Sequence, residues 1–211
     1  MGGVDHLLPV LHISRLRINM DGAGVTSLVG LAGCPNHCRY CINFRRLQQK
    51  PVLLAPTTLY QQLMVDDLYF RATGGGVTFG GGEPLLSAGG IADFARLVAG
   101  SWQLRMETSL NVPWAQVEVC LPWIDQWIVD VKDMNDAIYR AYTGCSGQHM
   151  RENLSRLAAL TPEKLQVRLP RIPGYNTADD LRRSHELLQS IGVVHVTEFD
   201  YKPFSANWPE D

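Results

Sequence analysis

Residues 74–84 read GGGVTFGGGEP, a short apolar run that leads into a glycine-rich turn and a carboxylate. A short run between turn residues is typical of a buried strand. Glycines without Cβ atoms let a ligand approach the backbone closely, and Glu83 can accept hydrogen bonds from an ammonium group. A phosphate loop is the competing interpretation, but the G-K-[ST] signature that would neutralise phosphate is missing. The stretch therefore predicts a strand followed by a turn that binds an amino group, or an ordinary glycine turn.

Apolar runs of this kind recur along the chain and alternate with helical patterns. The predicted strands are 25–32, 76–79, 103–108, 127–131, 165–169 and 195–199. The predicted helices lie near 58–70, 91–99, 113–120, 136–142, 150–160 and 178–191. This alternation predicts right-handed βαβ units and a parallel sheet. Six units are too few to close an eight-stranded barrel. We therefore expect an α/β fold, an open partial (β/α)6 barrel of parallel strands with ligands at the carboxyl ends of the strands.

Length and composition exclude several classes of protein. At 211 residues the chain is long enough for one substantial core but short for two. We expect a single domain over 1–211, with an N-terminal extension at 1–20 and a C-terminal tail at 200–211. The net charge of −2 gives no electrostatic footprint for nucleic acid. No window approaches 18 uninterrupted apolar residues and the chain starts without a signal-peptide pattern, so we expect a cytoplasmic protein with no membrane partner.

A cysteine cluster follows the first predicted strand, where residues 33–41 read GCPNHCRYC. Cys34, Cys38 and Cys41 have C-x3-C-x2-C spacing. Three thiolates on one tight loop can bind three corners of an iron–sulfur cube, which leaves the fourth iron open to another ligand. The chain has five cysteines, an odd number, and three of them are clustered. This arrangement indicates metal rather than a disulfide framework.

A structural zinc ion is the alternative occupant of this loop, with His37 or His149 in the fourth position. Zinc sites more often use paired C-x2-C knuckles, so the spacing favours the cluster. The two other cysteines, Cys120 and Cys145, have no motif around them. We interpret both as small core residues.

The two motifs together closely resemble the radical S-adenosylmethionine (SAM) superfamily: the cysteine triplet, with Tyr40 before its last member, and the GGEP turn at 81–84. The resemblance implies that the cysteines hold a [4Fe-4S] cluster, that SAM binds the open iron, and that Tyr40 flanks the adenine. It also implies that Gly81, Gly82 and Glu83 contact the methionine end of SAM. The implied activity is reductive cleavage of SAM to a 5′-deoxyadenosyl radical, which abstracts hydrogen from a substrate.

A narrower resemblance covers most of the chain and is to the glycyl-radical enzyme activating enzymes, typified by the pyruvate formate-lyase activating enzyme. The sequence DGAG at 21–24 is similar to the D-G-P-G opening of that group, and Asn43 matches the asparagine after its last cysteine. Four features differ. Ala23 replaces the proline, and Val25 and Thr26 stand where an arginine usually follows it. Ile42 replaces a histidine, and DYK at 200–202 stands where these enzymes carry a SAM-contacting histidine.

The narrower resemblance implies further SAM-binding residues at the ends of the later strands. These are Glu107, Thr108, Ser109, Asp130, Lys132 and Arg168. Lys132 joins the three cysteines in the expected catalytic set. A simple surface ion pair between Asp130 and Lys132 is the alternative.

A monovalent cation is also expected beside the SAM carboxylate. Glu107 and Asp130 end adjacent strands, and two anions near each other in a partly dry site are costly unless a cation intervenes. By resemblance to the activating enzymes, Thr108 and the carbonyl of Ile128 would be further oxygen donors. Neutralisation by Lys132 or by solvent is the alternative.

Three functions stay open. The first is an activating enzyme that acts as a monomer, receives electrons from a flavodoxin- or ferredoxin-type donor and takes hydrogen from a glycine of a partner enzyme or peptide. A six-stranded sheet stays open at one side, which leaves room for a partner's loop. The second is a radical SAM enzyme that modifies a small molecule or peptide, resembling deazaguanine synthases or peptide-maturation enzymes. In that case residues 201–211 close the pocket, and Arg168 or Lys202 grips an anionic substrate. The third is a metal-stabilised binding protein without catalysis.

Overall fold

One mixed sheet forms the centre of the computed structural model, which describes residues 6–18 and 20–201. The strand order is β3-β1-β2-β4-β5-β6-β7-β8. Six strands run parallel to one another: β2 (Val25–Leu31), β4 (Gly76–Gly81), β5 (Gln103–Thr108), β6 (Gln126–Asp130), β7 (Leu165–Arg171) and β8 (His195–Asp200). The sheet ends at β3 and β8, which do not pair with each other, so the predicted open partial barrel of six parallel strands is confirmed.

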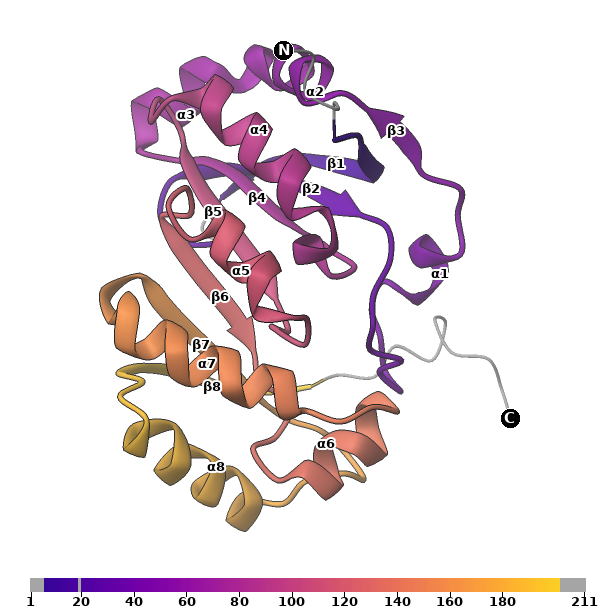
Figure 1. Cartoon of the computed structure of the whole chain (residues 1–211), viewed down its shortest axis with the longest axis vertical. Coiled ribbons are helices and arrows are strands. Elements are labelled where there is room, and N and C mark those ends of the chain that lie inside the picture. Colours follow the sequence, from indigo (N-terminus) through magenta and orange to yellow (C-terminus); the bar gives the residue numbers. More distant parts are fainter. Residues whose placement is uncertain (1–5, 19, 202–211) are drawn as a thin grey trace.

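Helices connect successive parallel strands. The longer ones are α2 (Pro56–Leu63), α3 (Asp67–Thr73), α4 (Ala88–Val98), α5 (Trp114–Cys120), α6 (Asp136–Thr143), α7 (Gln148–Leu160) and α8 (Ala178–Ser190). The short ones are α1 (Phe44–Leu47), η1 (Met64–Asp66), η2 (Pro84–Ser87) and η3 (Pro162–Lys164). Figure 1 shows α4, α5, α7 and α8 following one another from the top to the bottom of the molecule, in the order of the strands they connect. Within the described ranges no helix has the length and apolar character needed to span a bilayer.

Two strands at the start of the sheet were not predicted. β1 (Leu8–Ile18), which falls within the expected N-terminal extension, pairs antiparallel with β2 and with the three-residue β3 (Val52–Leu54). The pairing with β2 contains register shifts between Val10 and His12 and between Ser14 and Arg17, which are typical of β-bulges. The sheet therefore has eight strands rather than six. At the other end the expected tail lies outside the described residues from Lys202 onward.

The predicted helix at 58–70 is interrupted in the structure. It divides into α2, η1 and α3, and the interruption turns Asp66 inward, where only 3% of its surface is exposed. The Asp66 carboxylate accepts hydrogen bonds from Arg15 Nε at 3.0 Å and Ser27 Oγ at 2.8 Å. A buried carboxylate needs such partners, and here they fasten the helical layer to β1 and β2.

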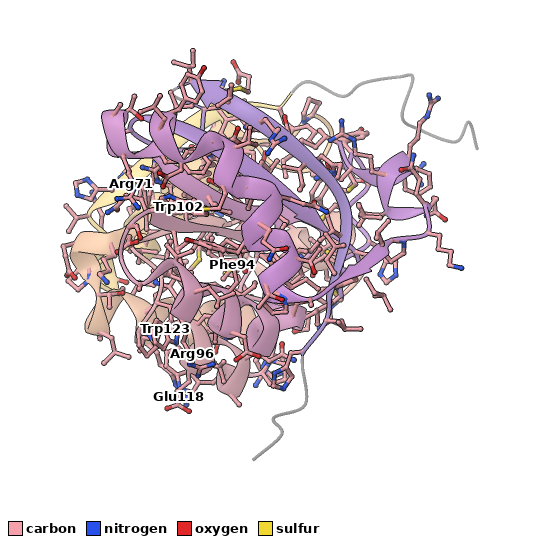
Figure 2. The ribbon with its side chains drawn as sticks, turned by 90° about the horizontal axis from the view of Figure 1, so that it is seen from above. Arg71, Phe94, Arg96, Trp102, Glu118 and Trp123 are labelled. Carbon is pink, nitrogen blue, oxygen red and sulfur yellow. The ribbon has the colours of Figure 1, made fainter. Side chains whose placement is uncertain are left out.

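The core lies between the sheet and the helices. Phe94 of α4 packs edge-on against Phe79 of β4, with ring centroids 5.4 Å apart. The centroid of the Phe94 ring also lies 6.4 Å from that of Trp102, and Figure 2 labels these last two residues. Nearer the surface, the Arg96 guanidinium lies 5.4 Å from the centre of the Trp123 ring. Figure 2 labels both residues. Aromatic contacts of this kind add to the stability that burial of their apolar surface provides.

Candidate active site

A cavity of about 360 Å³ lies at the carboxyl ends of the parallel strands. Twelve residues that the sequence predicts for the site line it: Cys34, Cys38, Cys41, Gly81, Gly82, Glu83, Glu107, Thr108, Ser109, Asp130, Lys132 and Arg168. Six further residues line it that were not among the predicted site residues: Asn36, Ile42, Asn43, Tyr142, Phe199 and Tyr201. Tyr40 and Ile128 are not among the lining residues. The parallel arrangement thus gathers motifs that are more than 100 positions apart in the chain.

The cysteine loop takes its shape from contacts with the end of α6. His37 N donates to the carbonyl of Thr143 at 2.8 Å, and Arg39 N donates to the carbonyl of Tyr142 at 2.9 Å. Gly33, which opens the loop, has a φ of +85°, a conformation that favours glycine. The loop is therefore fixed at its start and in its middle by the protein itself.

Asn36 connects this loop to three other elements through its buried side chain. Its Nδ2 donates to Tyr139 Oη at 3.1 Å, and its Oδ1 accepts from Asn111 Nδ2 at 2.9 Å and from Cys145 Sγ at 3.0 Å. Cys145 is thus a half-buried neighbour of the loop, whereas Cys120 is fully buried in the core. Sequence reasoning did not identify Asn36, because a single asparagine between two cysteines carries no distinctive spacing.

The three thiols are partly shielded from solvent. Burial raises the pKa of Cys34 to about 12 and that of Cys38 to about 11. Iron would therefore have to displace a proton from each thiol as it binds. In the part of the chain that the structure describes, no three His, Cys, Asp or Glu side chains are grouped closely enough to share one metal ion. Thiols spread around one cavity fit a cubane cluster, because each of three irons takes its own thiolate.

The glycine turn after β4 packs directly against the cysteine loop. Gly82 N donates to the carbonyl of Leu31 at 2.8 Å, and Glu83 N donates to that of Gly33 at 2.7 Å. A Cβ on Gly82 would lie only 2.0 Å from the Gly33 oxygen. Asn43 Nδ2 donates to the carbonyl of Gly81 at 2.8 Å. Glycine is required here so that the two loops can approach each other.

The Glu83 side chain is buried, with 1% of its surface exposed, and joins the turn to the end of β5. One carboxylate oxygen accepts from Thr108 Oγ1 at 2.6 Å and from Leu85 N at 3.3 Å. The other accepts from Ser109 N at 2.9 Å and Ser109 Oγ at 2.7 Å. Burial raises the pKa of Glu83, and the hydrogen bonds from Thr108 and Ser109 oppose that rise. The structure therefore shows Glu83 bracing one wall of the cavity.

Two ion pairs lie across the strand ends. Arg168 Nη1 donates to Glu107 Oε1 at 2.8 Å, and Lys132 Nζ lies 3.4 Å from Asp130 Oδ2. Burial raises the pKa of Glu107, and the charge of Arg168 opposes that rise. Burial lowers the pKa of Lys132, but Asp130 and Cys38 outweigh it and the net shift is upward. Glu107 and Asp130, the two acids expected beside a monovalent cation, thus each already face a basic side chain.

Tyrosines form the wall next to the cysteine loop. The Tyr40 ring packs with Tyr142, Tyr175 and Tyr201, at centroid distances of 6.1, 5.9 and 6.3 Å. The Tyr201 hydroxyl donates to the Tyr40 carbonyl. Phe199 and Tyr201 lie two residues apart at the end of the last parallel strand, on the side that faces the cavity. The rule that ligands bind at carboxyl ends of strands would have pointed to both.

Comparison with known proteins identifies the family. The model of a 4Fe-4S single cluster domain matches residues 20–109. The isethionate sulfite-lyase activating enzyme of Nitratidesulfovibrio vulgaris is 31% identical, over 83% of this chain and 78% of that enzyme. The chain belongs to the radical SAM activating enzymes of glycyl-radical enzymes. As a member of this family it uses a [4Fe-4S] cluster and SAM as cofactors, and the donors around the cavity fit both.

Other activating enzymes match over different shares of their length. The pyruvate formate-lyase 2-activating enzyme of Escherichia coli is 25% identical over 92% of this chain and 78% of that enzyme. The (2S)-3-sulfopropanediol dehydratase activating enzyme of Klebsiella oxytoca is 37% identical over 57% of this chain, and the match covers 38% of that enzyme.

Solved structures agree with this assignment at the level of the fold. SuiB from Streptococcus suis superimposes with a TM-score of 0.67 and 10% identity, over 87% of this chain and 41% of SuiB. Methylornithine synthase (PylB) has a TM-score of 0.57 and 13% identity, over 81% of this chain and 51% of that protein. At this identity the likeness concerns the open α/β barrel alone.

Proposed function

We propose that this activating enzyme holds its cluster on Cys34, Cys38 and Cys41, binds SAM in the adjoining cavity and generates a glycyl radical on a partner enzyme. The observation that carries the proposal is that the three thiols, the glycine turn and the ends of β5, β6 and β7 share one cavity. The chemistry supplied by the bound cofactors is one-electron reductive cleavage of SAM, which yields methionine and a hydrogen-abstracting adenosyl radical. The protein's contribution is to orient the reactants and to keep water away from them.

Several features of the cavity support binding of SAM at its two ends. The turn at Gly81 and Gly82, braced by Glu83, offers backbone groups to the methionine end beside the cysteine loop. Lys132 keeps its positive charge, since Asp130 raises its pKa, and is suited to hold a carboxylate. Tyr201 and Phe199 line the cavity with aromatic rings, which are suited to stack on the adenine base.

A monovalent cation next to the SAM carboxylate stays a prediction. The expected ligands, Glu107, Thr108, Asp130 and the carbonyl of Ile128, lie at the ends of β5 and β6. A cation would have to compete with Arg168 and Lys132 for the two carboxylates. Turnover that is the same in potassium, sodium and a bulky organic cation would argue against this site.

The proposed partner is a glycyl-radical enzyme, because the curated relatives are activating enzymes of such proteins. The open sheet supports this, since no strand pairing links β3 to β8 and the cavity is not enclosed by a complete barrel. A glycine suits the reaction because its α-hydrogen can be approached without a Cβ in the way. We further propose that the enzyme works as a monomer and takes its electron from a flavodoxin- or ferredoxin-type donor.

The first test of this proposal concerns the cluster. Protein purified and reconstituted without oxygen should contain about four irons and four sulfides per chain. Replacing Cys34, Cys38 or Cys41 by Ala should abolish the cluster, whereas the matched variants Cys120→Ala and Cys145→Ala should keep it. Stoichiometric zinc without iron in the parent protein would contradict the assignment.

The second test concerns the product. The reduced enzyme, SAM and a candidate glycyl-radical enzyme are incubated together and electron paramagnetic resonance spectra are recorded. We expect a carbon-centred doublet whose main splitting disappears when the partner's glycines carry deuterium at the α-carbon. Consumption of a small molecule or a peptide with formation of 5′-deoxyadenosine, and no radical on any candidate partner, would overturn the proposal.

A further inference from the structure

The segment that begins in the last part of the cysteine loop and continues beyond it is strongly basic. Residues 39–50 read RYCINFRRLQQK, with four basic residues and no Asp or Glu, in a chain of net charge −2. The segment leaves the loop through α1, which lies at the outer edge of the molecule in Figure 1. The mechanism described above uses none of its charged side chains.

The backbone of segment 39–50 ties these charges to the cluster loop. Phe44 N donates to the carbonyl of Cys41 at 3.1 Å, and Leu47 N donates to that of Asn43 at 2.9 Å. Ile42, which lies between Cys41 and Asn43, is 62% exposed and also lines the cavity. An apolar side chain next to a cluster ligand is thus open to solvent within a basic stretch.

Three charges of this segment lack an acidic partner within the described part of the protein. Arg45, Arg46 and Lys50 are exposed, and among residues 6–18 and 20–201 no acidic side chain forms an ion pair with any of them. Arg46 Nη1 instead contacts His12 Nε2 at 2.6 Å. Burial, together with the charge of Arg46, lowers the pKa of His12, so this partner is a neutral one. Several arginines elsewhere do pair with acids, as Arg140 does with Asp136 at 3.2 Å.

We propose that segment 39–50 is the docking surface for an acidic one-electron carrier protein that reduces the cluster. This inference rests on the proposed function, because only a cluster on the adjoining cysteines needs such a donor. An exposed apolar centre with a charged surround has the anatomy of a transient protein interface. Positive charge without an acidic partner attracts an anionic protein and raises its association rate. In the transfer the carrier loses one electron and the cluster gains it, with no proton or atom exchanged.

The test uses the reconstituted enzyme and a bacterial flavodoxin, reduced beforehand, as the probe. The variant Arg45→Glu/Lys50→Glu reverses two charges outside the cavity and keeps Arg46 on His12. We expect its second-order rate of cluster reduction by flavodoxin to fall by about tenfold or more at low ionic strength, and the difference to shrink to about twofold near 0.5 M salt. Cluster reduction and SAM cleavage driven by photoreduced deazaflavin, which is uncharged, should equal those of the parent.

A matched control separates a local effect from a change in net charge. Arg156→Glu/Arg183→Glu makes the same change on the exposed surfaces of α7 and α8 and should leave the flavodoxin rate as in the parent. An equal loss in this control would overturn the proposal. So would an unchanged rate in Arg45→Glu/Lys50→Glu, or a parent protein that accepts no electron from flavodoxin while deazaflavin drives SAM cleavage.

Two further outcomes distinguish this inference from the proposed function. If deazaflavin drives no SAM cleavage in any variant or in the parent, the proposed function itself fails, and the docking inference with it. If Arg45→Glu/Lys50→Glu is reduced normally by flavodoxin but no longer forms the glycyl radical, the surface binds the partner enzyme instead. That result would overturn the electron-carrier assignment and leave the proposed function intact.

Discussion

Gly82→Ala tests the contact between the glycine turn and the cysteine loop. The new Cβ would lie 2.0 Å from the carbonyl oxygen of Gly33 and 2.9 Å from that of Leu31. A carbon and an oxygen in contact stay about 3.3 Å apart, so the two loops must separate by more than about 1 Å. That movement breaks the hydrogen bonds from Gly82 N to Leu31 and from Glu83 N to Gly33, now 2.8 and 2.7 Å long.

The size of the effect follows from these two losses. Each hydrogen bond contributes about 0.5–1.5 kcal/mol net, and the displaced packing costs about 1–3 kcal/mol. We therefore expect the free energy of unfolding to fall by about 2–6 kcal/mol, which for a chain of this size lowers the melting temperature by roughly 4–24 °C. Because Gly33 directly precedes Cys34, the cluster ligand moves with the loop, and the iron content should fall below one cluster per chain.

Thermal unfolding followed by circular dichroism, and iron analysis after anaerobic reconstitution, measure the two effects. Gly100→Ala is the matched control, because Gly100 has a φ of +77° and a Cβ added there would have no neighbouring atom within 4 Å. The backbone strain that alanine introduces there should lower the free energy of unfolding by only about 1–2 kcal/mol, and the variant should keep its cluster. A Gly82→Ala protein with the melting temperature and iron content of the parent would refute the reasoning.

Three other substitutions have defined outcomes. Arg168→Met removes the cation beside Glu107, so the pKa of Glu107 rises further above its ordinary value of 4.5. The folded protein then holds this proton to higher pH than the unfolded chain does. In urea unfolding, the variant's loss of unfolding free energy relative to the parent should therefore be larger at pH 8 than at pH 5. An equal loss at both pH values would contradict this. Asn36→Ala removes the side chain that joins the cysteine loop to three residues elsewhere in the chain. A chelator should therefore remove iron from this variant faster than from the parent. Equal rates of iron loss would show that the loop does not need the Asn36 side chain. Thr177→Ala breaks the capping box at the start of α8. It should lower the free energy of unfolding in denaturant by about 1 kcal/mol and leave SAM cleavage unchanged. A loss of SAM cleavage would contradict a purely local role.

The parallel part of the fold was predictable because each of its strands is an apolar run followed by a helix with its own periodicity. β1 was not, because Pro9, His12, Arg15 and Arg17 interrupt its apolar pattern, and its antiparallel partner cannot be inferred from local sequence. The break in the helix at 58–70 depends on Asp66 finding partners on two strands. Such long-range polar contacts leave no periodic signal.

The candidate site was predictable where its residues form motifs and unpredictable where they act through tertiary contact. The cysteine spacing and the glycine turn place their residues around the cavity because both follow parallel strands. Tyr201 was expected as a departure from the family pattern and, under the second function, as the start of a segment that closes the pocket; in the structure it lines the cavity and contacts Tyr40. The hydrogen bonds that fill both oxygens of Glu83 could not be read from the chain, since Thr108 and Ser109 reach it only in the folded sheet.

The bonds from the cysteine loop to Tyr142 and Thr143 set an order of events in biosynthesis. A ribosome completes the three cysteines long before it reaches α6, so the emerging chain carries its thiols on a loop that lacks these supports. Iron delivered at that stage would meet flexible thiols that can be oxidised or can take the wrong metal. The shaped receptor exists only after most of the chain has been made and has folded. The supported form of the cysteine loop therefore requires translation at least through α6.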